Sequence, residues 1–133
     1  MSHTAISLKN LQEIEQALQY IDEHLEEPFT LKMLSDRFYI STYYFHRTFK
    51  TVVGNTVATY IRERRTLFAC KLLCETDLSI TEIIKRCGFQ SLQAFSRTFK
   101  RITGLSPSEF RERGEKPVIL SAKDIIENFK LSM

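Results

Sequence analysis

Apolar side chains recur at helical spacing along most of the chain. The first apolar stripe consists of Leu11, Ile14, Leu18, Ile21 and Leu25. Intervals of three and four residues predict an amphipathic helix. We expect this helix to begin at a capping box formed by Asn10 and Glu13 and to end near Glu26. The chain has only four glycines and three prolines, so few positions interrupt helices and the pattern favours an all-α fold.

One stretch of the chain occurs in two nearly identical copies. The segment Arg47–Gly54 is RTFKTVVG, and fifty residues later Arg97–Gly104 is RTFKRITG. Upstream the offset becomes 49 residues, so that Thr30 corresponds to Ser79. Two copies are too few for a solenoid. The repeat therefore indicates one supersecondary unit that is used twice.

Each copy has the signals of a short helix, a tight turn and a longer helix. The capping and terminating residues are Thr30, Ser41 and Gly54 in the first copy, and Ser79, Gly88, Ser91 and Gly104 in the second. Side-chain oxygens of Ser and Thr cap helix starts, and glycine favours the left-handed conformation at helix ends. We expect one helix-turn-helix at about residues 30–54 and another at about residues 79–104.

A stretch without breakers joins the two units. Residues 56–75 have helical spacing and contain neither Gly nor Pro, and a helix of about twenty residues spans roughly 30 Å. After the second unit, Ser106 followed by Pro107 is expected to open a short helix that ends at about Arg113.

The last residues, 115–133, form a C-terminal extension. Ser121 is suited to cap an extra short helix with Ile125, Ile126 and Phe129 on one side. Two interpretations of this helix are open. It either packs back on the preceding domain or presents an apolar face to a partner.

The repeated helix has two faces. The expected core face consists of Phe45, Phe49 and Val52 in the first copy, and Phe95, Phe99 and Ile102 in the second. The other face consists of Tyr43, His46, Arg47 and Lys50, and of Gln93, Ser96, Arg97 and Lys100. Spacing of i, i+3, i+4 and i+7 makes each set one continuous face, and neither contains an acid.

The second face has the chemistry of a DNA reader. Arg can donate two parallel bonds to guanine, Gln pairs with adenine, and Lys neutralises phosphate. A solvated polar face is the alternative. The recurrence of Arg and Lys at matching positions in both copies favours DNA contact.

Charge is distributed unevenly along the chain, although the net charge is only +3. Residues 1–36 contain seven acids and two bases, and residues 37–133 contain 17 bases and nine acids. This asymmetry favours a polyanion partner for the basic part. Arg62, Arg64 and Arg65 form a basic cluster near the start of the linker, for which phosphate contact and solvated charge are equally open interpretations.

No chemistry of catalysis or metal binding is evident. The chain has an odd number of cysteines, Cys70, Cys74 and Cys87. We expect them to be reduced thiols in a cytoplasmic protein. Cys70 and Cys74 are flanked by apolar residues without further ligands nearby, so we expect small core residues rather than a metal site. No nucleophile–base pair, phosphate loop, signal peptide or membrane span is found, and we expect neither enzyme activity nor a cofactor nor a membrane partner.

The order and spacing of these motifs resemble the DNA-binding domain of the AraC/XylS family of bacterial transcription regulators, especially its small stand-alone activators. The resemblance extends from about Leu11 to Arg113. It rests on the two RTFK helices, on Tyr60-Ile61-Arg62, on Gly88-Phe89 and on the closing PSEFR at residues 107–111. It implies about seven helices within a domain at residues 8–114, with two helix-turn-helix units and a long linker helix.

The resemblance also implies a function. The chain would be a sequence-specific regulator, an activator, with two recognition helices in adjacent major grooves and with RNA polymerase as protein partner. By motif position, Tyr43, His46 and Arg47 fall where the family contacts the first groove. Leu92, Gln93, Ser96 and Arg97 fall where it contacts the second. The linker length favours a monomer on double-stranded DNA with an asymmetric site. The alternative is a helical docking module that uses the acidic first helix without specific DNA binding.

The chain departs from the family pattern at several positions. Tyr43 and His46 stand where the small activators usually have Trp and Gln, which changes the expected base preference. Leu92 replaces a usual polar residue, so contact with a thymine methyl is expected there. Tyr39 stands where Gly is usual. If the turn requires positive φ, Tyr39 carries strain of about 1 kcal/mol.

Overall fold

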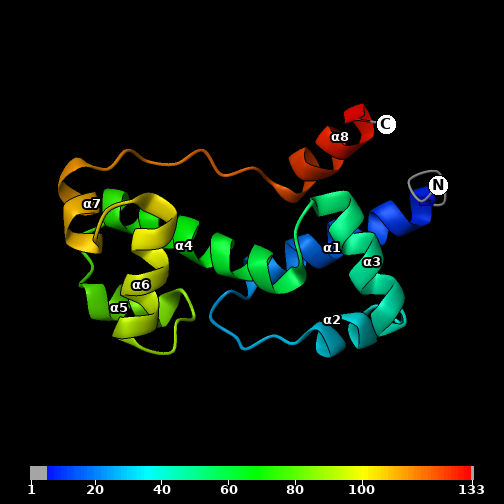
Figure 1. The fold of residues 1–133 in the computed structure, drawn as a ribbon, viewed down its shortest axis with the longest axis horizontal. Coiled ribbons are helices and arrows are strands. Elements are labelled where there is room, and N and C mark those ends of the chain that lie inside the picture. Colours follow the sequence, from blue (N-terminus) through cyan, green and yellow to red (C-terminus); the bar gives the residue numbers. More distant parts are fainter. Residues whose placement is uncertain (1–5, 133) are drawn as a thin grey trace. The chain divides into compact units, whose positions relative to one another are not determined.

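The structure is a computed structural model in which residues 6–132 are described, and that part of the chain is all-helical (Figure 1). Its helices are α1 (Leu8–Glu23), α2 (Leu31–Arg37), α3 (Thr42–Val53), α4 (Val57–Glu75), α5 (Ile80–Arg86), α6 (Leu92–Thr103), α7 (Pro107–Arg113) and α8 (Ala122–Ser132). The all-α fold with two helix-turn-helix units is confirmed. No helix within residues 6–132 has both the length and the apolar character that crossing a membrane requires.

The helices are grouped in two compact units. The first unit contains Phe29–Tyr60, together with residues 6–24 and 120–132. The second unit contains Ile61–Ile119 and the short segment Leu25–Pro28. The boundary therefore falls within α4, and each unit contains one helix-turn-helix with a core of its own.

The core of the first unit forms where α1, α3 and α8 pack together. Its buried side chains include Ile14, Leu18 and Ile21 of α1, Phe45 and Phe49 of α3, and Ile126 and Phe129 of α8. The C-terminal extension thus packs back on the unit that contains the first helix-turn-helix. The side chain of Ser121 caps α8 by accepting the N–H of Asp124 at 3.1 Å, as expected from the sequence.

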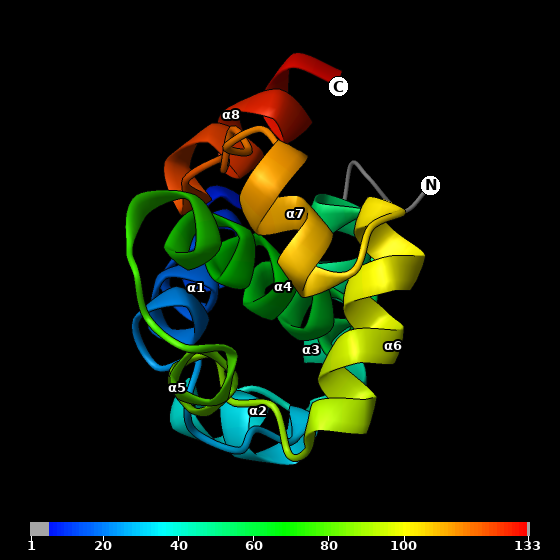
Figure 2. The ribbon, with the colours of Figure 1, turned by 90° about the vertical axis from the view of Figure 1, so that its left-hand side faces the viewer.

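The core of the second unit is built around aromatic side chains of α6, which contacts both α5 and α7. Figure 2 shows α7 beside α6. Phe95 lies between Phe89 and Phe99, with ring centroids 4.9 and 5.3 Å away, and the rings of Phe99 and Phe110 form a T-shaped pair with centroids 5.4 Å apart. Burial of large apolar side chains such as these is the main source of stability for a small unit.

The cysteines occupy different environments. Cys70 and Cys87 are buried in the second core, and burial raises the pKa of each thiol to about 12. All three cysteines are free thiols. The prediction that Cys74 is also a core residue was wrong, because Cys74 is exposed. Cys70 and Leu73 occupy the inward face of α4, and the next residue along the helix turns to solvent.

Most helix starts follow the predicted caps. The hydroxyl groups of Thr30, Ser41, Ser79, Ser91 and Ser106 each accept the backbone N–H three residues later. The first helix differs from the prediction. It begins after Ser7, whose hydroxyl accepts the N–H of Asn10 at 3.2 Å, and it ends at Glu23. The side chain of Asn10 is used elsewhere, since it donates to the hydroxyl of Tyr44 at 2.6 Å.

The two repeats also differ at the end of their second helix, α3 in the first copy and α6 in the second. Val52 is buried, but Ile102, which the pattern placed in the core, is 37% exposed. Val52 lines a groove together with Ile125 and Phe129, so the C-terminal extension shields it. In the described part of the second unit, Ile102 remains at the surface.

Gly88 ends α5 with a φ of +78°, and it lies in a confined space. A Cβ atom at this position would stand 2.2 Å from the carbonyl oxygen of Leu25 and 2.9 Å from Nε of Arg65. Gly104 also has positive φ, +81°, but a Cβ atom there would meet nothing within 4 Å. The backbone conformation favours glycine at both positions, whereas only at Gly88 does the available space exclude a side chain as well.

We predict that Gly88→Ala destabilises the protein more than Gly104→Ala. The Gly104 change should cost about 1–2 kcal/mol from the left-handed backbone alone. The Gly88 change should cost about 1–3 kcal/mol more, because the backbone carbonyl must also shift. Urea unfolding of both variants measures the difference. Equal losses of unfolding free energy would show that the loop around Leu25 can shift at little cost.

Candidate nucleic-acid interface

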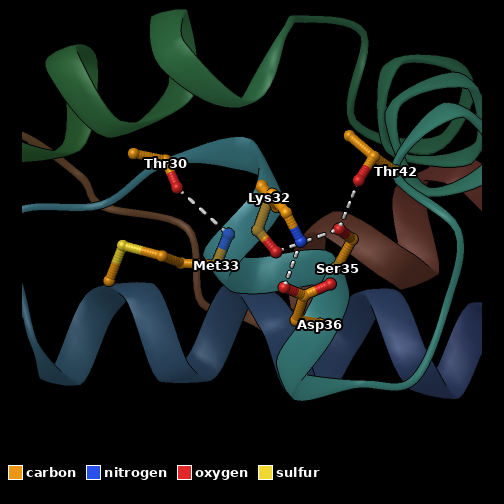
Figure 3. Close-up of polar contacts among 6 residues, drawn as sticks. All are labelled: Thr30, Lys32, Met33, Ser35, Asp36 and Thr42. Atoms are coloured by element: carbon orange, nitrogen blue, oxygen red, sulfur yellow. Dashed lines mark hydrogen bonds and ion pairs between the residues drawn. The ribbon is translucent and has the colours of Figure 1, made fainter.

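One buried hydroxyl joins the two helices of the first helix-turn-helix (Figure 3). Ser35 of α2 is fully buried and donates to the carbonyl of Lys32 at 3.1 Å. Its oxygen lies 3.0 Å from the hydroxyl of Thr42, the first residue of α3. Because Ser35 has one proton, Thr42 is the donor in this second bond. The start of α3 is thereby fixed against α2.

Further contacts join the first helix-turn-helix to α1. The Tyr44 hydroxyl accepts from Asn10, and the Arg37 guanidinium lies 4.0 Å from the ring centroid of Tyr20. The Tyr60 hydroxyl, at the start of α4, donates to the carboxylate of Asp22 at 3.3 Å. These three contacts connect α1 to α2, α3 and the first turn of α4.

The outward face of α3 contains the predicted residues. Tyr43, Arg47 and Lys50 are exposed, and His46 is half-buried. The Arg47 guanidinium lies 5.7 Å from the ring centroid of Tyr43, within the range of a cation–π contact. The face of α3 is free of acidic residues. It thus presents a cation beside an aromatic ring, with a second cation three residues further along.

The outward face of α6 presents a different set of groups. Leu92, Gln93, Arg97 and Lys100 are exposed, and Ser96 is half-buried. Within residues 6–132, the side chains of Gln93, Ser96 and Arg97 form no hydrogen bond or ion pair. Their donors and acceptors are therefore available to a ligand.

One residue of this face was missed by the sequence analysis. Arg101 is exposed and follows Gln93 and Arg97 at four-residue intervals, so the three lie in one row along α6. The spacing was visible in the sequence. In the first copy the matching position is Thr51, and the comparison of copies by shared residue type therefore left Arg101 out.

The basic cluster on α4 does not act as one group. In the second unit, Nε of Arg65 donates to the carbonyl of Leu25 at 2.9 Å and Nη2 donates to that of Glu27 at 2.7 Å. Burial lowers the pKa of this guanidinium below its usual value. Through these bonds Arg65 holds the segment around Leu25 against the turn at Gly88. Phosphate contact stays a prediction for Arg62, which is exposed, and for Arg64, which is half-buried.

The structure also bears on metal binding. Across residues 6–132, no three His, Cys, Asp or Glu side chains lie close enough together to hold a metal ion.

Comparison with known proteins gives a consistent set of similarities. A family model described as a helix-turn-helix domain matches residues 34–113. The chain is 35% identical over 113 residues to the regulatory protein SoxS of Salmonella typhimurium LT2, covering 85% of this chain and 99% of SoxS.

Two solved structures are similar in fold. The DNA-binding domain of the global transcriptional factor AdpA, solved in complex with a target DNA, matches with a TM-score of 0.72 and 33% identity. The match covers 75% of this chain and 90% of that domain. The C-terminal domain of AraT, a response regulator from Geobacillus stearothermophilus, matches with a TM-score of 0.73 and 28% identity, covering 87% of this chain and 94% of that one.

We predict that Ser35→Ala loosens the first helix-turn-helix. The change removes the buried acceptor of Thr42 and should lower the free energy of unfolding by about 1–3 kcal/mol. Thr42→Ser is the matched control, since it keeps the hydroxyl and should cost less. Thermal and urea unfolding measure both. If Ser35→Ala is as stable as the parent protein, the bond does not hold the two helices together.

Proposed function

Because the chain belongs to the AraC/XylS family of DNA-binding transcription regulators, we propose that it activates transcription by binding an asymmetric DNA site through α3 and α6. The observation that carries this proposal is the repeated outward face. Arg47 and Lys50 on α3 recur as Arg97 and Lys100 on α6, and all four are exposed. Neither helix contains an acid that would repel phosphate.

The matching residues divide the work of recognition. An arginine that projects into the major groove donates two bonds to O6 and N7 of guanine, so Arg47 and Arg97 contact bases. A lysine three residues further along the helix lies nearer the edge of the groove, so Lys50 and Lys100 contact phosphates. The arginines then specify sequence, and the lysines supply affinity on any DNA.

The residues that differ between the helices make the two half-sites unlike. Tyr43 and His46 accompany Arg47 on α3, whereas Leu92, Gln93 and Ser96 accompany Arg97 on α6. Gln93 suits adenine, and Leu92 suits the methyl group of thymine. Since one chain carries both recognition helices, a monomer suffices and the site need not be a palindrome.

Activation and the protein partner rest on the resemblance to the small stand-alone activators. We propose RNA polymerase as that partner and no catalytic activity of the chain itself. Transcription from a promoter with the selected site, measured with purified polymerase, tests the direction of regulation. A fall in transcript on adding the protein would identify a repressor. The comparisons match DNA-binding regulators and give no support to a docking module without DNA binding.

We predict that Arg47→Ala and Arg97→Ala each weaken binding to the preferred site by about 1–3 kcal/mol and relax preference at one position. Selection from a random oligonucleotide pool, followed by titration, measures both effects. Arg113→Ala is the control, because Arg113 lies on α7, where it is ion-paired with Glu109. A loss that is equal on every sequence would show that the arginine contacts only phosphate.

The lysines should behave differently. Lys50→Ala and Lys100→Ala are each expected to weaken binding on specific and unrelated DNA alike, and to reduce the slope of log affinity against log salt by about one. Lys123→Ala, an exposed lysine on α8, serves as control and should leave the slope unchanged. Titrations at several salt concentrations provide the slopes. An unaltered slope in Lys50→Ala would remove that side chain from the interface.

A further inference from the structure

The turn between α2 and α3 contains an unusual residue. Tyr39 has a φ of +57°, and within residues 6–132 it is the single residue other than glycine with positive φ. Its side chain is 97% exposed. A tyrosine in the left-handed region is strained, and here no burial of the ring offsets the strain.

The second helix-turn-helix meets the same backbone requirement in another way. The matching residue is Gly88, whose φ is +78°. There the carbonyl of Leu25 and the guanidinium of Arg65 fill the space that a side chain would need. The turn at Tyr39 is open, so a large side chain fits and projects into solvent. Strain of this kind is found where a side chain acts outside its own fold.

Two cations near this turn, Lys32 and Arg37, contact other side chains of the unit. Lys32 forms an ion pair with Asp36 at 2.7 Å, as Figure 3 shows, and the guanidinium of Arg37 covers the ring of Tyr20. The backbone N–H of Tyr39 is also used, since it donates to the carbonyl of Asp36 at 3.1 Å. The phenolic hydroxyl of Tyr39 is therefore an exposed donor at this turn, whereas the backbone N–H of the same residue is already bonded.

We propose that the hydroxyl of Tyr39 donates a hydrogen bond to a DNA phosphate beside the segment contacted by α3, an inference that rests on the proposed function. In a helix-turn-helix, the first helix crosses the sugar-phosphate backbone and the start of the second helix meets the bases. Tyr39 precedes the cap of α3, Ser41, by two residues, so it stands in the turn between these two helices. Tyrosine hydroxyls are among the donors that contact phosphates.

Two substitutions separate the hydroxyl from the backbone strain. Tyr39→Phe removes only the oxygen, whereas Tyr39→Gly removes the side chain and relieves the strain. Both should weaken binding about tenfold, on the preferred site and on unrelated DNA alike, because a phosphate contact carries no sequence information. The Gly variant should also unfold at a temperature about 2–4 °C higher than the parent protein. A gain in stability with a loss in affinity excludes misfolding as the cause.

Arg47→Ala, measured beside these variants, distinguishes a failure of the inference about Tyr39 from a failure of the proposed function. Weaker binding by Arg47→Ala with unchanged binding by Tyr39→Phe overturns this inference and leaves the proposed function standing. If Arg47→Ala has no effect either, the proposed function of α3 fails. Unchanged DNA affinity of Tyr39→Phe with reduced transcription would place the contact on a protein partner and would also overturn the inference.

Discussion

Four phenylalanines determine which side chains the recognition helices present to solvent. Phe45 and Phe49 on α3, and Phe95 and Phe99 on α6, are fully buried. A pair of aromatic rings one turn apart fixes the rotation of a helix about its axis, because turning the helix would expose both rings to water. The face opposite each pair is then the one with Arg47 or Arg97. The exposure of the residues proposed to contact DNA therefore depends on hydrophobic packing within each unit.

The two units use the same helix pair but support it differently. In the first, the hydroxyl of Ser35 and the extension that ends in α8 hold α3. In the second, Arg65 and the segment around Leu25 enclose the turn at Gly88. A shared motif thus tolerates different supports, provided that the turn and the buried face are kept. These supports also determine which turn has room for a large side chain.

Much of the fold followed from local signals. Caps such as Thr30 and Ser41 were predicted correctly because a hydroxyl and an N–H three residues apart form a bond that needs no distant partner. The candidate site was largely predictable too, since exposure of the face around Arg97 follows from helical periodicity. Arg101 was missed because its counterpart in the first copy is not a base. The start of α1 was misplaced because Ser7 and Asn10 are both good caps.

The sequence by itself determined the all-α class, the two helix-turn-helix units, and the acid-free faces of α3 and α6. Each depends on residues within one or two helical turns. Only the tertiary structure decided that Cys74 and Ile102 are exposed and that Arg65 is bonded to the Leu25 and Glu27 carbonyls. It alone showed that α8 packs on α1 and α3. The partners of Arg65 and of α8 lie about 40 or more residues away in the sequence. The spacing of residues along one helix contains no information about which distant segment covers that helix.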